Sequence, residues 1–329
     1  MQRTRRICLV AIVALGLAGC QTAATRPSPT AQRQPLTSVQ AERLLKDIAA
    51  IGRLADQGQS GAVKAAFEQL KAEFPQIGRF DLAIFADGEI AYASRRYNKA
   101  ARSFEKVLDD YPESELRQPA LSRLYQIGTR YLAGQVSMDL LIFRIKGYER
   151  GVQLLERVSQ ETGLQDPNGL GLRSAMAIAR SYEQRKMYEE AYLKWSQIAA
   201  VWDTGQPGKE ALLGMAQDKL ASYKQHPPNR RHLYNIAHLA AARTYYQRLK
   251  SLWPEEASRL NIDQILQEID QEVARRQLAV AQYYMRTGKR QAASLYLDMV
   301  VTDWPNTSAA QIARQLLAQK GLQDGGTRD

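Results

Sequence analysis

The pattern of apolar and polar positions is clearest between Asp81 and Pro112, where it predicts two short amphipathic helices joined by a tight turn. Small or apolar residues recur there at helical spacing: Ile84, Gly88 and Ala91, then Ala100, Phe104 and Val107. Small side chains at Gly88 and Ala100 would let the two antiparallel helices approach closely, and Phe104 would fill the space beneath them. We expect the second helix to end at Pro112.

A similar unit precedes this stretch. Its first helix is predicted to run from Ser38, as the N-cap, to Ala55, and its second from Gly61 to Pro75. Pro75 and Pro112 are about one repeat period apart, because a tetratricopeptide repeat is a helix pair of about 34 residues. The helix pair therefore occurs at least twice at the expected spacing, which favours a repeat over a single helical hairpin.

Four later units follow the same pattern, although the third of them is degenerate and is broken near His226. Their diagnostic positions are Gly128, Tyr131, Gly151, Leu155 and Val158; Ala179, Tyr182, Ala191, Trp195 and Ile198; Leu213, Gly214, Ala242, Tyr246 and Leu249; and Ala281, Tyr284, Gly288, Ala293, Leu297 and Val300. The stretch Ala133–Gly147 is longer than a tight turn, so we expect an insertion or an elongated helix there. No stretch alternates with period two, so no β-sheet is expected. The chain is predicted to be an all-α, tetratricopeptide-type α-solenoid of five to six helix pairs.

The N-terminus begins with arginines at positions 3, 5 and 6 and an apolar run from Ile7 to Leu17, which is too short to span a bilayer. The run ends in Leu-Ala-Gly-Cys, with the cysteine at position 20. This motif is similar to the lipobox of bacterial lipoproteins, in which the peptide is cut before the cysteine and the cysteine is lipidated. Residues 1–19 are therefore expected to be a signal peptide and Cys20 to carry a covalent lipid. The alternative is an ordinary secretory signal with a chance cysteine.

The remaining segments divide by composition. Residues 20–37 are small, polar and proline-bearing and are predicted to be a flexible tether, followed by the solenoid at 38–319 and a disordered tail at 320–329. Cys8 lies in the predicted signal peptide, so the mature chain is expected to have no disulfide. The residue after Cys20 is Gln21 and not Asp. By resemblance to lipoproteins of bacteria with two membranes, this implies a lipid anchor at the periplasmic face of the outer membrane.

The formal net charge is +11, and removal of the three signal-peptide arginines would leave +8. A basic chain can bind nucleic acid, but these cations are scattered along helices and the protein is expected to be exported. No nucleic acid partner is therefore expected. We interpret most of the charge as solvated helix faces that could also favour an anionic membrane or an acidic partner.

Candidate chemistry is sparse. The three histidines, His226, His232 and His238, lack the spacing of metal ligands, so no metal is expected. No GxSxG, HExxH, phosphate-binding or dinucleotide-binding motif is present. Paired carboxylates such as Asp109-Asp110 and Glu189-Glu190 are interpreted as surface charge. The sequence predicts a protein that is not an enzyme and has no cofactor beyond the lipid on Cys20.

Function is then expected on the surfaces of the array. The first helix of each pair lines the concave side in tetratricopeptide proteins, which implies a groove for an extended or strand-like peptide. The candidate groove residues are Phe85, Glu89, Tyr92, Tyr125, Thr129, Met176, Arg180 and Glu183. For Phe85 and Tyr125 the alternative is that they pack in the core between repeats.

Two segments resemble the BamD (YfiO) family of outer-membrane assembly lipoproteins. They are residues 85–114 and residues 273–307, the latter with Tyr283-Tyr284, Gly288 and Ala292-Ala293 at the positions typical of the last repeat in that family. The similarity spans most of Ala41 to Gln319 and is diffuse in the middle. Extra sequence near 133–147 and 224–231 departs from the family pattern.

The resemblance implies a scaffold of the machine that assembles outer-membrane β-barrels. Its expected partners are the central barrel protein, other assembly lipoproteins and unfolded outer-membrane protein segments. The implied docking residues for the barrel protein are Arg275, Arg276, Gln282 and Arg286. The alternative is a scaffold or pilotin for another envelope complex, such as a secretin or pilus. An enzyme partner domain is a third class, which the absence of a catalytic constellation disfavours.

Overall fold

The computed structural model describes residues 36–73, 80–134, 137–140 and 143–320, which form antiparallel helix pairs. The pairs are α1 (Ser38–Asp56) with α2 (Ser60–Glu73), α3 (Phe80–Ala93) with α4 (Tyr97–Asp110), α5 (Arg117–Leu132) with α6 (Tyr148–Thr162), α7 (Leu170–Gln184) with α8 (Tyr188–Val201), α9 (Gly205–Lys224) with α10 (Ala237–Leu252), and α12 (Ile262–Arg286) with α13 (Arg290–Asp303). A short helix α11 (Pro254–Arg259) precedes α12, and α14 (Ser308–Lys320) packs on the last pair. The predicted all-α solenoid is confirmed.

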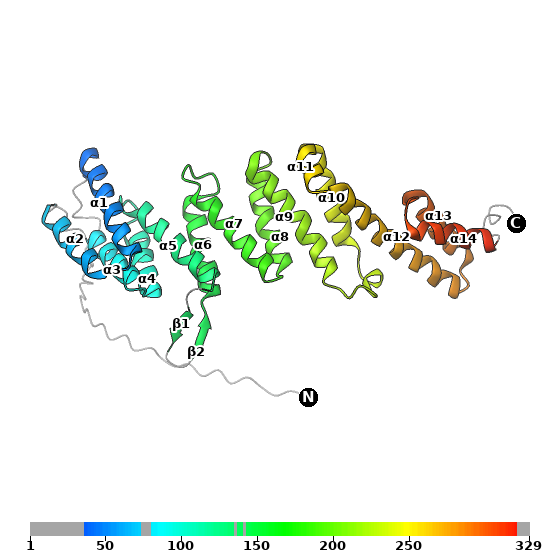
Figure 1. The fold of residues 1–329 in the computed structure, drawn as a ribbon, viewed down its shortest axis with the longest axis horizontal. Helices are drawn as coiled ribbons and strands as arrows, with labels where there is room; N and C mark the ends of the chain where they lie inside the picture. Colours follow the sequence, from blue (N-terminus) through cyan, green and yellow to red (C-terminus); the bar gives the residue numbers. More distant parts are fainter. Residues whose placement is uncertain (1–35, 74–79, 135–136, 141–142, 321–329) are drawn as a thin grey trace, which may run out of the picture.

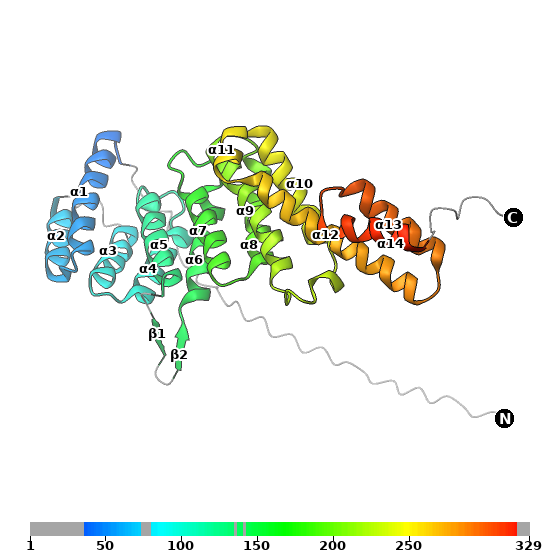
Figure 2. The same ribbon diagram turned by 45° about the vertical axis from the view of Figure 1, so that its right-hand side comes forward.

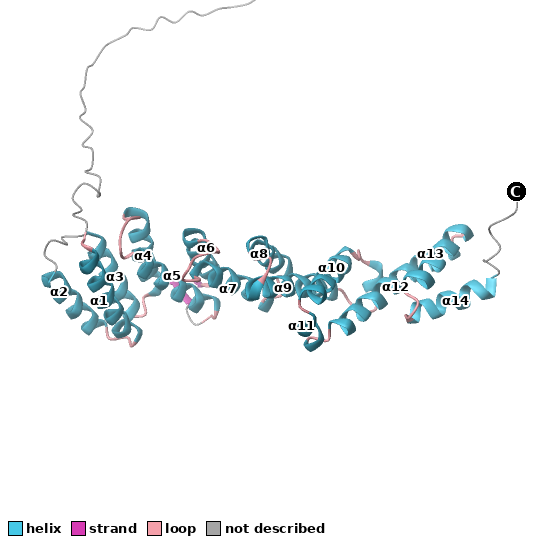
Figure 3. Cartoon of the chain, turned by 90° about the horizontal axis from the view of Figure 1, so that it is seen from above, coloured by secondary structure: helices cyan, strands magenta, loops and turns pink. Residues whose placement is uncertain are grey.

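The pairs stack along one direction into an elongated array, which Figure 1 shows from the side and Figure 3 from above. The first helix of each pair runs in the same sense. The turns inside the pairs therefore lie along one edge of the array, and the connections between pairs lie along the other (Figures 1 and 2). The first helices α1 and α3, and likewise α5 and α7, lie side by side in this array, which positions the candidate groove.

Glycines allow the helices of a pair to touch. A Cβ on Gly88 would lie 2.7 Å from Cε1 of Phe104, so the Phe104 ring fills the space beside Gly88, as predicted. In the next pair a Cβ on Gly151 would lie 2.8 Å from the Tyr131 Cβ and 2.9 Å from the backbone oxygen of Gly128. These contacts fix the spacing between α5 and α6 more tightly than side-chain packing alone would.

The connection between α5 and α6 corrects one expectation. Strands β1 (Ser137–Leu140) and β2 (Phe143–Lys146) form an antiparallel hairpin that projects from the array (Figure 1). The prediction of no β-sheet is therefore wrong for this segment, and of the two alternatives the insertion is the observed one. Gly134 (φ +70°) ends the helical path after α5. Strands of four residues are too short to give sustained period-two alternation.

Two smaller differences concern helix ends. The N-cap of α1 is Thr37 and not Ser38, because the backbone N–H of Gln40 donates to Thr37 Oγ1 at 3.3 Å in a capping box. The degenerate unit contains an insertion with a 3₁₀ turn, η2 (Arg231–Leu233), in which the His226 ring stacks on Tyr234 with centroids 3.7 Å apart. The expected signal peptide, Cys20 and most of the tether and tail lie outside the described residues, so those predictions remain untested.

Two turns hold a long side chain in the left-handed backbone conformation. Arg95 (φ 58°) and Lys186 (φ 60°) occupy the position that Gly58 and Gly288 hold in two other pairs. An L-residue is strained there, whereas glycine is not. We expect Lys186→Gly to raise the free energy of unfolding by about 1 kcal/mol, measured by urea denaturation. The reciprocal variant Gly288→Lys should lower it by a similar amount; an unchanged or lower stability of Lys186→Gly would contradict the account.

Candidate functional site

The first three helix pairs enclose an open groove made of two adjoining hollows. The first, of about 260 Å³, is walled by α1 and α5, with Phe85 and Glu89 of α3 in its floor. The second, of about 540 Å³, is lined by Asp56, Tyr92, Gln126, Thr129, Arg130 and Ala133. Asp56 and Gln126 line both hollows, so they form one continuous groove along the first helices. Its walls are helical, which gives fixed positions to the lining side chains.

Arg123 of α5 is the centre of the groove floor. Its Nε and Nη2 donate to the two Glu89 carboxylate oxygens at 2.7 and 2.8 Å, and Nη1 donates to Asp56 Oδ1 at 2.6 Å. Nη1 also donates to Gln126 Oε1 at 2.6 Å, and Nη2 to the Gly52 carbonyl at 2.8 Å. All five guanidinium N–H groups are thereby used. Arg123 ties α1, α3 and α5 together and has no donor left for a ligand.

Burial and charge act in opposite directions on Glu89. Burial raises the pKa of its carboxyl, and the hydrogen bonds and charge of Arg123 oppose that rise. The same pairing raises the pKa of Arg123 although burial acts to lower it. The Arg123 guanidinium also lies 4.3 Å from the centroid of the Tyr92 ring. The floor is therefore a desolvated ionic cluster whose partners depend on one another.

The second hollow contains polar side chains that the Arg123 cluster does not use. Arg130 lies 6.0 and 5.7 Å from the Tyr92 and Tyr97 ring centroids and forms no ion pair with a carboxylate of the described residues. A hydrogen bond to Tyr92 raises the pKa of Arg130, so its guanidinium stays charged. The amide nitrogen of Gln126 adds a neutral donor beside it, whereas Thr129 Oγ1 donates to the Gln126 backbone oxygen at 2.9 Å and keeps only acceptor capacity. The hollow can therefore bind carbonyl or carboxylate oxygens.

The predicted groove residues divide into floor and wall. Phe85, Glu89 and Tyr92 lie in the floor of the two hollows and are 1, 2 and 3% exposed, which leaves little surface for the ligand contact expected of them. The Phe85 ring packs edge-on against Phe67 and Phe104, as the core alternative predicted. Arg123, from the next pair, covers Glu89 and Tyr92. Phe85, Glu89 and Tyr92 therefore form the floor of the groove.

Of the other predicted groove residues, Thr129 lines the second hollow and Tyr125 is half-buried against the N-terminal core. Met176, Arg180 and Glu183 of α7 lie outside both hollows. Arg180 is exposed and pairs with Glu210 of α9 at 2.6 Å. Glu183 accepts a hydrogen bond from Trp195 Nε1 at 2.6 Å. Sequence reasoning missed Gln126 and Arg130; the polar spacing of Ser122, Gln126 and Thr129 on one helix face was the available signal.

The predicted docking residues all lie on α12. Arg275, Gln282 and Arg286 share one face because positions separated by seven and eleven residues nearly coincide on a helix. Arg276 lies about 100° away from them around the helix. Arg275 and Arg286 are exposed, and Arg275 Nη1 lies 3.4 Å from Glu272 Oε1. The structure thus brings three of the four residues together.

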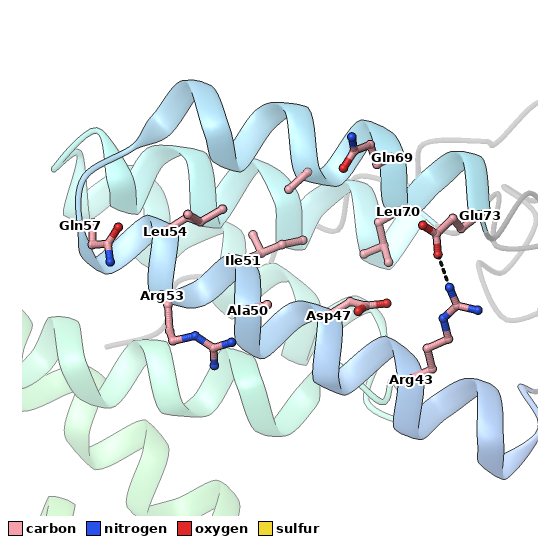
Figure 4. Close-up of a pocket in the computed structure, with 11 residues that line it drawn as sticks. Arg43, Asp47, Ala50, Ile51, Arg53, Leu54, Gln57, Gln69, Leu70 and Glu73 are labelled. Carbon is pink, nitrogen blue, oxygen red and sulfur yellow. Dashed lines mark hydrogen bonds and ion pairs between the residues drawn. The ribbon is translucent and has the colours of Figure 1, made fainter.

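A further open hollow of about 510 Å³ lies between α1 and α2 at the end of the array (Figure 4). Its floor includes Ile51, Leu54 and Leu70, and an ion pair between Arg43 and Glu73 at 2.7 Å spans one end. Both partners of this pair are at least half exposed, so it contributes little to stability. This hollow carries no fixed charge cluster comparable to that of Arg123.

One buried carboxyl lies outside the groove. Asp218 of α9 is 1% exposed, and its Oδ2 has no hydrogen-bond partner among the described residues. Burial, reinforced by repulsion from Glu183 and Glu189, raises the pKa of Asp218 to about 8. The folded protein therefore holds this carboxyl protonated at neutral pH.

This carboxyl predicts a pH-dependent stability. Because the pKa is about 8 in the folded state and near 3.8 in the unfolded state, the free energy of unfolding should fall as pH rises between these values and then level off. We expect Asp218→Asn to raise the free energy of unfolding by about 1–3 kcal/mol above pH 8 and to remove that slope. Urea denaturation from pH 5 to 9 measures this, with the exposed Asp87→Asn as control. A slope that persists in Asp218→Asn would contradict the assignment.

Comparison with known proteins supports the class of fold. Residues 88–114, which cover the second half of α3, α4 and the following loop, match the family described as tetratricopeptide repeat. No curated protein matches the chain. The match covers part of one helix pair, and the repetition of such pairs along the array supports a tetratricopeptide-type architecture, in which repeats generally mediate protein–protein interactions.

Two absences among the described residues bear on what the protein can do. No helix in the described ranges is long and apolar enough to cross a membrane. No group of three or more histidine, cysteine or acidic side chains there could hold a metal ion.

Proposed function

We propose that the groove along α1, α3 and α5 binds an extended segment of an unfolded partner protein. The observation that supports this proposal is that the hydrogen-bond donors of the groove floor are used within the protein, whereas donors of the groove wall are not. All the N–H groups of Arg123 are used in linking three helices, while Arg130 and the side-chain amide nitrogen of Gln126 beside it remain available to donate to a ligand. A preformed groove lowers the ordering cost of binding because its walls need no rearrangement.

The chemistry of the two hollows suits an extended chain. The first hollow is lined by apolar groups, including Leu45, Ile48 and Pro119, which can receive alternate side chains of a strand. The second hollow supplies donors for main-chain carbonyls or a terminal carboxylate. Strand-like segments with alternating apolar residues fit this order of surfaces better than a folded domain does.

We further propose that the protein is a non-catalytic, lipid-anchored scaffold at the periplasmic face of the outer membrane, with its lipid on Cys20. In this role it would bind the central protein of the β-barrel assembly machine, other assembly lipoproteins and unfolded outer-membrane proteins. The sequence resemblance, the lipobox-like motif and the repeat array support this role. The shared face of Arg275, Gln282 and Arg286 is the proposed surface for the barrel protein.

Affinity purification of the lipidated protein from detergent-solubilised outer membranes tests this role. We expect recovery of a barrel protein with periplasmic domains, reduced several-fold by Arg286→Glu and unchanged by the matched variant Arg248→Glu on α10. Recovery that survives Arg286→Glu would place the docking surface elsewhere. Recovery of only a secretin or pilus subunit would contradict the assembly role and favour the alternative scaffold.

A further inference from the structure

The turns inside the helix pairs carry a repeated charge pattern. Four of them contain two adjacent cations: Arg95-Arg96 between α3 and α4, Arg185-Lys186 between α7 and α8, Arg230-Arg231 between α9 and α10, and Lys289-Arg290 between α12 and α13. These turns lie along one side of the array, at the bottom in Figures 1 and 2. We call these eight residues the basic edge.

The basic edge is available to a ligand. All of its side chains except Arg231 belong to exposed residues, and none forms an ion pair with a carboxylate of the described residues. Arg185 lies 3.5 Å from the Tyr148 ring centroid, which orients it without neutralising it. By contrast, many cations on the helix faces are paired, such as Lys219 with Glu189 at 2.7 Å.

Helix dipoles do not account for this edge. The C-terminus of every helix attracts cations, so both edges of the array would be basic if the dipole were the cause. Three of the second helices instead end near acids, namely Asp109-Asp110 of α4, Glu161 of α6 and Asp303 of α13, whereas α2 and α10 have Lys71 and Lys250 in the last turn. The charge of the basic edge therefore does not follow from the helix dipoles alone.

Backbone strain gives independent support. Arg95 and Lys186 are cations in the left-handed conformation, at positions where glycine would be unstrained. Strained residues that a fold retains often serve a function. Here the retained property is a long, positively charged side chain at the tip of these two turns.

Exposed apolar side chains accompany the cations. Leu233 is 63% exposed, and Tyr234 lies next to it in the insertion that carries Arg230. Tyr283, in the last turn of α12, is 54% exposed. Cations that flank exposed aromatic and aliphatic groups are the combination found where proteins meet the interface of an anionic bilayer.

We propose that the basic edge docks on the surface of an anionic lipid bilayer, with the long axis of the array parallel to the membrane. A broad planar surface of phosphate-bearing headgroups can meet turns spread along the whole array at once, which a compact acidic protein domain cannot. The hairpin projects from the same edge, and its four-residue strands, about 13 Å long, would then enter the headgroup layer. This orientation leaves the concave groove and its ligand outside the contact.

Vesicle flotation tests the proposal with the full chain carrying Cys20→Ser in every variant, so that no acyl chain contributes. The edge variant combines Arg96→Glu, Lys186→Glu, Arg230→Glu and Lys289→Glu. The matched control reverses four exposed cations on helix faces, none of them in an ion pair between described residues: Lys46→Glu, Lys64→Glu, Lys106→Glu and Arg248→Glu. The N-terminal segment is common to all variants and cancels in the comparison. Circular dichroism of both variants tests whether they are folded.

We expect the parent to float with phosphatidylcholine vesicles that contain phosphatidylglycerol, and far less with phosphatidylcholine alone. The edge variant should partition at least about tenfold more weakly onto the anionic vesicles, because each cation near such a surface contributes substantially to binding. The control should lose much less, and added salt should weaken parent binding. Equal losses in the two variants, or no preference of the parent for anionic vesicles, would overturn the proposal. An edge variant that no longer folds would be replaced by the pair Arg230→Glu and Lys289→Glu.

Discussion

Replacing Arg123 with alanine should cost about 3–5 kcal/mol of folding free energy, because it leaves a buried carboxylate without its partner. Glu89 would lose both hydrogen bonds from the guanidinium, and the Gly52 carbonyl and Asp56 would lose the contact that links α1 to α5. Urea denaturation measures the total effect. Hydrogen exchange should show lost protection in α1, α3 and α5, with α12–α14 nearly unchanged, since repeats interact mainly with their neighbours.

Two controls sharpen this expectation. Arg43→Ala removes the exposed pair with Glu73 and should cost less than about 1 kcal/mol. The double variant Arg123→Met with Glu89→Leu should recover most of the stability, because an apolar pair can replace a buried ion pair. A cost for Arg123→Ala no larger than that of Arg43→Ala would show that the cluster does not hold the three helices together.

Adding one methyl group at Gly151 should also destabilise the protein, by about 1–3 kcal/mol, because the helices of that pair are in backbone contact. The new Cβ would lie 2.8 Å from the Tyr131 Cβ and 2.9 Å from the Gly128 oxygen, atoms that cannot move without separating α5 from α6. The same change at Gly61 meets nothing within 4 Å and should stabilise α2 by up to about 1 kcal/mol. Thermal unfolding of the two variants therefore should shift in opposite directions; shifts of the same sign would contradict the packing.

The elements that the sequence predicted well are those determined by local spacing. Phe104 was expected to fill the space beneath Gly88 because both lie on the apolar faces of consecutive helices, and its ring does lie against Gly88. The hairpin was missed because its pairing, such as Met138 opposite Ile145, spans strands too short for a periodic signal. Helix periodicity thus identifies the array but not what its insertions form.

The ion pairs of the groove floor could not be predicted from local sequence patterns, because they join residues that are far apart in the chain. Arg123 binds Glu89 and Asp56, which are 34 and 67 residues away in the chain. No single-helix pattern shows that three first helices bring these charges together. Glu89 was consequently expected to contact a ligand in the groove, although its spacing from Phe85 and Tyr92 places it on the buried face of α3.

The central claim is that the groove along α1, α3 and α5 receives an extended partner segment, and site-specific photo-crosslinking tests it most directly. A photoreactive residue at Thr129 would lie in the second hollow, and one at Lys106 would lie on the exposed face of α4. With a urea-diluted outer-membrane barrel protein, we predict crosslinks from position 129 that a folded barrel does not give, and few from position 106. Equal crosslinking from both positions, or none from position 129, would contradict the account.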